Sequence, residues 1–95
     1  MNNVDSKSTK DKIYDWVYYM CTHHNFNQVK DIPVMFTREY LATRYNISNR
    51  QVERILLSLI EENKLYRYKI YNNIYIYSIT PKDITKDVFV RVRQC

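Results

Sequence analysis

Apolar residues recur with helical spacing in two segments of the chain. The first predicts a helix that buries Ile13, Trp16, Val17 and Met20, at the spacing i, i+3, i+4, i+7. Ser8 precedes this segment and is suited to cap it. The second predicts a helix over residues 49–63, whose buried stripe consists of Val52, Ile55, Leu56, Leu59 and Ile60. Each helix therefore presents one apolar face to a shared core.

Local signals between these helices predict a short strand, a second helix and a tight turn. The apolar run Val34–Phe36 follows a proline and favours an extended segment that could add a third strand to a sheet. Thr37 is a suitable cap for the next helix, and Asn46 stands in the turn after it, where Asn tolerates the left-handed conformation. Ser48 and Gln51 then form an S-x-x-Q capping box, which marks a helix start.

Residues 65–79 alternate in the manner of an antiparallel hairpin with its turn at Asn72-Asn73. A two-residue turn pairs Tyr71 with Ile74 and, by regular continuation, Arg67 with Ser78. In this register the face toward the helices carries Tyr66, Tyr68, Ile70, Tyr75, Tyr77 and Ile79. The outward face carries Arg67, Lys69, Tyr71, Ile74, Ile76 and Ser78.

This order of elements predicts an α+β fold of the winged helix-turn-helix class, with a three-helix core and an antiparallel hairpin wing. We expect the domain to span residues 8–80, after a flexible N-terminus at residues 1–7. Residues 81–95 form a C-terminal extension. Within it Thr80–Asp83 favours the start of a short helix, whereas Val88–Arg93 alternates like a strand. The sequence leaves that choice open.

Charge and composition point to a polyanionic partner. The 95-residue chain carries a formal net charge of +5 and has no glycine. From Lys64 to Lys82, both included, there are four basic residues and no acidic one, so the positive field is concentrated on the hairpin. Asn, Ile, Lys and Tyr are abundant and are encoded by A/T-rich codons. Their abundance indicates an A/T-rich genome, of the kind found in low-GC bacteria and their mobile elements.

Several classes of protein are disfavoured by features that the sequence lacks. No segment has the character of a signal peptide or a membrane span, so we expect a soluble, cytoplasmic protein. Two cysteines do not make a disulfide framework. We expect Cys21 to be a buried thiol and Cys95 a solvent-exposed end. His23 and His24 near Cys21 offer too few ligands for zinc, and we find no catalytic constellation. We therefore expect no metal, no cofactor and no enzymatic activity.

The helix at residues 49–63 is the candidate recognition helix. A rotation of 100° per residue places Arg50, Arg54, Leu57 and Glu61 opposite its buried stripe. Its first turn holds Asn49, Arg50 and Gln51, whose side chains suit base edges: Arg pairs with guanine, and Asn or Gln with adenine. We expect Arg50 and Arg54 to contact DNA. The alternative is an ordinary solvated face, and the helix as a whole is net acidic.

The hairpin supplies a second set of candidates, which combines cations with aromatic rings. We expect Lys64, Arg67 and Lys69 to hold phosphates, and Tyr71 and Tyr75 to stack on bases. The turn residues Asn72 and Asn73 complete this set. The tyrosines expected to pack on the helices instead are Tyr66, Tyr68 and Tyr77.

Three outward residues of the predicted hairpin, Tyr71, Ile74 and Ile76, form an apolar patch. Such a patch indicates stacked bases, a neighbouring protomer or a partner protein. The alternating segment Val88–Arg93 could also add to the sheet of a partner. These two features motivate an alternative function, that of a protein-interaction subunit of a replication enzyme.

Residues 37–59 resemble the helix-turn-helix core of bacterial winged-helix proteins. The similar positions are Leu41-Ala42, Ile47-Ser48, Val52, Leu56 and Leu59, with Lys64-Leu65 and Ser78-Ile79-Thr80 at the entry to and exit from the wing. This family includes repressors, replication initiators, single-strand binders and protein-interaction modules. Within this family, the chain is more similar to the small winged-helix single-stranded-DNA-binding proteins of staphylococcal cassette elements than to a repressor. Three features carry this similarity: an aromatic wing, a recognition helix that is not basic, and Asn residues in place of the usual Gly.

The resemblance implies a non-catalytic DNA-binding protein, with single strands favoured, that serves the replication or transfer of a mobile element. The alternative within DNA binding is a sequence-specific repressor that recognises double-stranded DNA through Asn49, Arg50 and Gln51.

Overall fold

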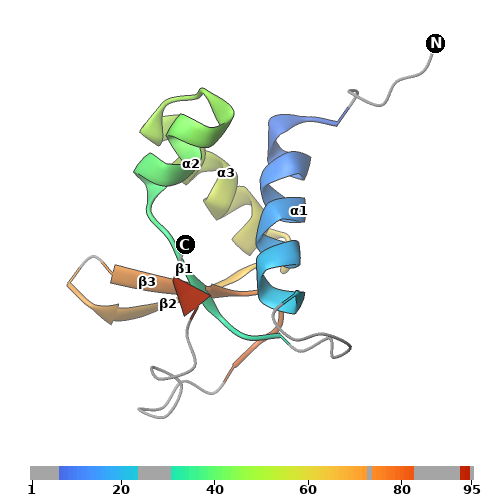
Figure 1. Ribbon diagram of the computed structural model, residues 1–95, viewed down its shortest axis with the longest axis vertical. Coiled ribbons are helices and arrows are strands. Elements are labelled where there is room, and N and C mark those ends of the chain that lie inside the picture. Colours follow the sequence, from blue (N-terminus) through green and yellow to red (C-terminus); the bar gives the residue numbers. More distant parts are fainter. Residues whose placement is uncertain (1–6, 24–30, 73, 83–92, 95) are drawn as a thin grey trace.

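In the computed structural model, which describes residues 7–23, 31–72, 74–82 and 93–94, three helices lie over one side of a small sheet (Figure 1). The elements are α1 (Thr9–Thr22), β1 (Val34–Met35), α2 (Arg38–Tyr45), α3 (Asn49–Glu61), β2 (Tyr66–Tyr71), β3 (Ile74–Ser78) and β4 (Arg93–Gln94). Within the described residues the strand order is β2-β3-β1-β4, and the β2–β3 hairpin projects beyond the helices. The α+β winged-helix class predicted from the sequence is confirmed. None of the helices in this part of the chain is long and apolar enough to cross a membrane.

Side-chain caps fix where the helices begin. The hydroxyls of Ser8 and Thr37 accept hydrogen bonds from backbone N–H groups three residues on, at 3.2 Å and 3.0 Å. At the start of α3, Ser48 and Gln51 form both arms of the capping box. All three predicted caps are confirmed, because each depends only on residues that are close in the sequence.

Asparagine takes the place of glycine where the backbone turns through the left-handed region. Asn46, Asn63 and Asn72 have φ values of 56°, 61° and 49°, and the chain has no glycine. Asn46 ends α2 within the helix-turn-helix turn. Beyond α3, the N–H of Lys64 donates to the Leu59 carbonyl at 3.0 Å, which closes the helix in a Schellman arrangement around Asn63. The chain then leads directly into β2.

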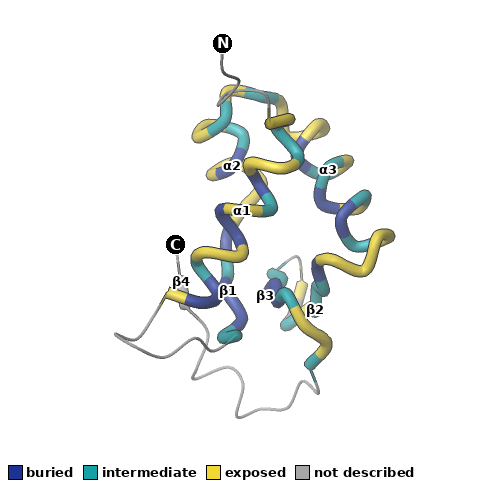
Figure 2. The backbone as a smooth tube through the Cα atoms, turned by 90° about the vertical axis from the view of Figure 1, so that its right-hand side faces the viewer, coloured by how far each residue is buried: buried dark blue, intermediate teal, exposed yellow. Residues whose placement is uncertain are grey.

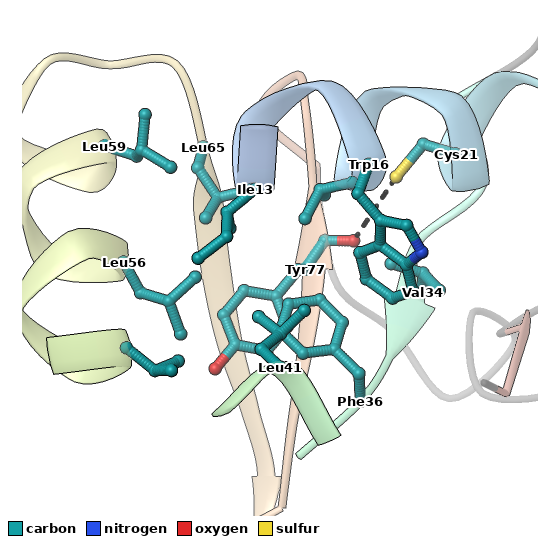
Figure 3. Close-up of a cluster of buried hydrophobic side chains, with 12 residues drawn as sticks. Ile13, Trp16, Cys21, Val34, Phe36, Leu41, Leu56, Leu59, Leu65 and Tyr77 are labelled. Carbon is teal, nitrogen blue, oxygen red and sulfur yellow. Dashed lines mark hydrogen bonds between the residues drawn. The ribbon is translucent and has the colours of Figure 1, made fainter. Parts of the chain in front are cut away.

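The core forms where the three helices meet the sheet, as Figure 3 shows. Its buried side chains are Ile13, Trp16, Val17, Cys21, Val34, Phe36, Leu41, Val52, Leu56, Leu59, Leu65 and Tyr77. Tyr77 stacks on Phe36 with ring centroids 4.2 Å apart, and Trp16 meets Phe36 edge-on at 5.3 Å. The Cys21 thiol lies 3.8 Å from the Tyr77 carbonyl oxygen. One aromatic cluster therefore ties α1 to β3.

The helical stripes predicted from the sequence supply much of this core. Buried and exposed positions alternate along α3 with the period of the helix, as the colours of Figure 2 show. The partly buried members at the margins of the stripes are Met20, Ile55 and Ile60. In α2 only Leu41 is buried, while Tyr45 is partly buried. Tyr40 is 37% exposed, although its ring contacts Trp16 at a centroid distance of 5.4 Å.

The hairpin register differs from the prediction because β2 contains a bulge. Tyr71 pairs with Ile74 as predicted, but Tyr75 pairs with Lys69 and not with Ile70. Across this step β2 has one residue more than β3, so every following pair is shifted by one residue. Such a shift moves the side chains of a strand to the opposite face of the sheet.

The predicted faces of β2 are consequently wrong. Arg67 pairs with Tyr77, a member of the core cluster, so both lie on the face turned toward the helices. Tyr68 pairs with Ile76 on the other face, where Ile76 is fully buried outside that cluster. The residues whose predicted face is wrong are Tyr66, Arg67, Tyr68 and Lys69.

A carboxylate clasp joins the segment before β1 to the end of the hairpin. Asp31 accepts hydrogen bonds from the Ser78 hydroxyl at 2.7 Å, from the Thr80 N–H at 2.9 Å and from the Thr80 hydroxyl. The Lys82 ammonium lies 3.5 Å from the same carboxylate oxygen. Burial by itself would raise the pKa of Asp31. The hydrogen bonds from Thr80 and Ser78 and the charge of Lys82 outweigh it and hold that pKa below its ordinary value.

These contacts also explain why Pro81 and Lys82 are not helical. Its hydroxyl is bound to Asp31 and does not cap a helix. The N–H of Lys82 donates to the Tyr68 hydroxyl at 2.7 Å, which fixes an irregular path. The predicted helix start is therefore wrong at Pro81 and Lys82.

Beyond this point, Arg93–Gln94 forms β4 and runs parallel to β1. Strand structure, the alternative that the sequence left open for the tail, is present at these two residues. The predictions for residues 1–6, His24, Asn73, residues 83–92 and Cys95 fall outside the part of the chain that the structure describes.

Replacing Asp31 with Asn should lower the free energy of unfolding by about 1–3 kcal/mol at neutral pH, because charge-assisted hydrogen bonds are lost. The folded-state pKa lies below the ordinary value of 3.8. The ionised carboxylate therefore stabilises the fold fully above that value, and this contribution disappears as the pH falls through the folded-state pKa. In urea unfolding, the difference between wild type and variant should shrink in acid.

Glu61→Gln is the matched control, since it removes an exposed carboxylate of α3 that has no hydrogen-bond or ion-pair partner among the described residues. It should unfold at nearly the wild-type urea concentration at every pH. An Asp31→Asn variant as stable as the wild type at neutral pH would contradict the clasp.

Candidate nucleic-acid interface

The solvent-facing side of α3 carries the first part of the candidate interface. Asn49, Arg50 and Arg54 are exposed, as predicted, and Leu57 beside them is 47% exposed. Among the residues that the structure describes, neither Arg50 nor Arg54 has a hydrogen-bond or ion-pair partner. Both guanidinium groups are therefore available to an external anion.

Gln51, another predicted base-reading residue, is occupied in the helix cap. Its side-chain oxygen accepts a hydrogen bond from the Ser48 N–H at 3.0 Å. The capping box holds this side chain against the helix end. The first turn of α3 thus offers Asn49 and Arg50 to a ligand more readily than Gln51.

Arg67 does not point outward from the hairpin but reaches α3. Its Nη1 donates to both carboxylate oxygens of Glu53 at 3.2 Å. Its guanidinium also lies over the Tyr75 ring, 4.6 Å from the centroid. Burial would by itself lower the pKa of Arg67. The Tyr77 hydroxyl and the Glu53 charge outweigh burial and raise that pKa, so the guanidinium keeps its positive charge.

A second guanidinium approaches the same carboxylate. The Arg38 Nη1 lies 4.0 Å from Glu53 Oε1, at the start of α2. The Arg67 side chain is 18% exposed and that of Arg38 is 52% exposed, so Arg67 is the inner partner and Arg38 the outer one. Glu53 therefore joins the hairpin, α2 and α3 at one point.

A groove of about 670 Å³ opens between the hairpin, the β1–α2 connection and α3. Its lining consists of Met35, Phe36, Thr37, Arg38, Glu39, Glu53, Arg67, Ile74, Tyr75 and Tyr77. A shallower hollow of about 500 Å³ shares Arg38 and Glu53 with it and continues along α3 past Asn49, Arg50, Arg54 and Leu57. Four guanidinium groups and two carboxylates line the two hollows, which leaves an excess of positive charge.

The remaining hairpin candidates lie in different surroundings. Lys69 is exposed and has no ion-pair partner within the described residues. Lys64 is 3.7 Å from Glu62 and 5.9 Å from the centre of the Tyr14 ring, so it belongs to the α1 side of the molecule. The structure therefore brings Lys69 near the groove residues of β3 but does not bring Lys64 there.

The tip of the hairpin is described in part. Tyr71 pairs with Ile74 through the backbone, but the position of its side chain lies outside the description. Asn72 is exposed, whereas Asn73 is not among the described residues. The predicted outward patch of Tyr71, Ile74 and Ile76 is wrong in one essential member, because Ile76 is fully buried.

Sequence reasoning missed Arg38 and Glu53 as members of the site. Both lie in the helix-turn-helix segment at positions that its pattern does not distinguish, and they are joined to Arg67 only through the tertiary structure. The signal that could have found this contact is the presence of a buried-side partner for Glu53 among the basic residues of β2. Recognising Arg67 as that partner required the true register of β2. Tyr75, by contrast, was predicted and does line the groove.

No three His, Cys, Asp or Glu side chains of the described residues gather closely enough to hold a metal ion. Comparison with known proteins found no match: no family model, no curated protein and no solved structure matches this chain. The arguments for function therefore come from the residues and the fold.

Because Arg67 binds Glu53 and Lys69 does not, replacing these two cations of β2 should affect the stability of the protein differently. Arg67→Ala should lower the free energy of unfolding by about 1–3 kcal/mol, because it leaves a partly buried carboxylate without its main donor. Lys69→Ala removes the same charge from the same face but breaks no described contact, so it should cost less than about 0.5 kcal/mol. Urea unfolding of both variants measures this difference. Equal effects would mean that Arg67 behaves as a solvated surface residue.

Proposed function

We propose that this protein binds DNA without catalysing a reaction, favours single strands, and serves the replication or transfer of a mobile element in the cytoplasm. The observation that carries the proposal is the basic face of α3, where Arg50 and Arg54 have no partner among the described residues, beside a groove bordered by the hairpin. In a winged-helix-like topology, the recognition helix and the wing meet at this surface. The resemblance of residues 37–59 to bacterial winged-helix proteins supports the same conclusion.

The preference for single strands rests on the chemistry of the groove. Tyr75 contributes aromatic surface to its wall, whereas Tyr77 also lines the groove but is buried in the core. Arg67 lies over the Tyr75 ring. Rings and guanidinium planes of this kind stack on unpaired bases with little regard to sequence. The groove lining holds two guanidinium groups and two carboxylates, so it offers the regular phosphates of a duplex no net positive charge. A single strand can turn its bases toward that wall and keep its phosphates on α3.

Recognition of a specific duplex sequence is the second candidate. It is favoured by one observation: Asn49 and Arg50 are exposed in the first turn of α3, the position from which recognition helices contact base edges. The protein-interaction alternative has lost part of its motivation, since Ile76 is buried within the monomer.

Binding of matched single- and double-stranded oligonucleotides at one fixed salt concentration tests the proposal. We expect the single strand to bind more tightly, with an affinity that falls steeply as salt rises, because phosphate contacts release counterions. A clear preference for one duplex sequence would replace the single-strand proposal with the repressor alternative. Absence of binding to either form would refute DNA binding.

Arg50→Ala and Arg54→Ala should each weaken binding of a single strand. Each should also reduce the slope of log K against log salt by about 0.7, the value for one phosphate contact. Lys12→Ala is the matched control, since it removes one exposed positive charge from α1. Fluorescence anisotropy titrations over a salt series supply both quantities. If Lys12→Ala lowers the slope as much as the two arginine variants, the affinity reflects net charge and not this face.

A further inference from the structure

The groove beside α3 contains a feature that a phosphate site would avoid. Glu53 contributes a carboxylate to its wall, and the neighbouring guanidinium groups of Arg67 and Arg38 are already directed at that carboxylate. Glu39 also lines the groove, so two guanidinium groups face two carboxylates and the formal charges cancel. A phosphate entering here would gain no net attraction. The groove therefore favours an uncharged ligand, whereas the hollow along α3, with Arg50 and Arg54, favours an anion.

The groove is suited in size and lining to a planar aromatic group. Its volume of about 670 Å³ lies within the range of small-molecule pockets. Tyr75 gives it aromatic surface, and Met35 and Ile74 give it aliphatic surface. Among the polar groups of the lining, the Glu53 carboxylate is held in position by Arg67 and Arg38, so it can orient a ligand. An unpaired base meets each of these conditions, because it is uncharged, planar and polar only at its edge.

We propose that this groove receives one unpaired base of a bound DNA strand and that Glu53 selects bases carrying an amino group. The proposal rests on the proposed DNA binding and adds a base-selective subsite to it. The adjoining basic hollow would hold the phosphates on either side of the inserted base.

The selectivity follows from the hydrogen-bonding capacity of a carboxylate. An ionised carboxylate only accepts hydrogen bonds and has about four lone-pair sites, of which the Arg67 Nη1 contacts occupy two. The amino group of cytosine donates to such an acceptor. Uracil and thymine present a carbonyl oxygen at the same ring position, so two acceptors would face each other without a proton between them. Glu53 therefore favours cytosine over uracil, two bases of nearly equal size.

The test compares oligodeoxycytidine with oligodeoxyuridine of equal length, at a mildly alkaline pH that keeps cytosine unprotonated. We expect the wild-type protein to bind the cytidine strand about tenfold more tightly, the effect of one hydrogen bond to a charged group. Glu53→Gln should reduce this ratio to less than about twofold, because an amide can turn either its donor or its acceptor to the base. Glu61→Gln is the matched control, since it removes the same charge from an exposed position of α3 outside both hollows. It should keep the wild-type ratio.

Equal affinity of the wild type for the two strands, or a preference that survives in Glu53→Gln, would overturn the subsite while leaving DNA binding intact. Failure to bind either strand would remove the proposed function itself, so the two failures are distinguishable. If Glu53→Gln does not fold, as judged by its thermal unfolding, modified strands test the wild type directly. Strands of N4,N4-dimethylcytosine, which has no amino donor, should then bind about tenfold more weakly than strands of 5-methylcytosine, which retains it. Equal binding of these two strands would also overturn the subsite.

Discussion

The one-residue bulge at Ile70 determines the character of the surface between the hairpin and the helices. Without it, Arg67 would lie on the far face of the sheet and the helix-facing side of β2 would be aromatic. With it, Arg67 stands opposite Tyr77, covers Tyr75 and reaches Glu53. The groove, its carboxylate and its guanidinium groups all follow from this local irregularity, because a shift of one residue exchanges the two faces of a strand.

The Arg67–Glu53 pair also shows how a small domain reconciles an acidic residue with a basic surface. Glu53 lies between Arg50 and Arg54 in the sequence, and alone it would oppose any anion approaching α3. Arg67 and Arg38 come from other elements and neutralise it, so the free charge of the surface resides on α3 itself. The surface is consequently divided into two neighbouring environments, a hollow along α3 that attracts anions and a more neutral groove beside it.

Features that depend on neighbouring residues could be predicted from the sequence. The caps at Ser8, Thr37 and Ser48 and the buried stripe of α3 arise within single segments. The exposure of Arg50 and Arg54 follows from the same helical period. The hairpin was predicted correctly at Tyr71 and Ile74 and failed one step later, because no composition signal marks a bulge at Ile70. The joining of Arg38, Glu53 and Arg67 required that register and the tertiary packing, which no local pattern contains.

The hairpin is fastened to the rest of the domain near its base. Asp31 binds Ser78 and Thr80, and Glu53 binds Arg67 on the neighbouring residue pair of the sheet. These two anchors fix the orientation of the base, and the pairs from Lys69–Tyr75 to Tyr71–Ile74 extend beyond them. A duplex resists deformation, since bending it costs on the order of 1–6 kcal/mol, whereas a flexible strand bears no comparable elastic cost. Under the proposed DNA binding, a hairpin whose base is fixed in this way would leave much of the adjustment to the nucleic acid, so stiffness of the ligand would count against its binding.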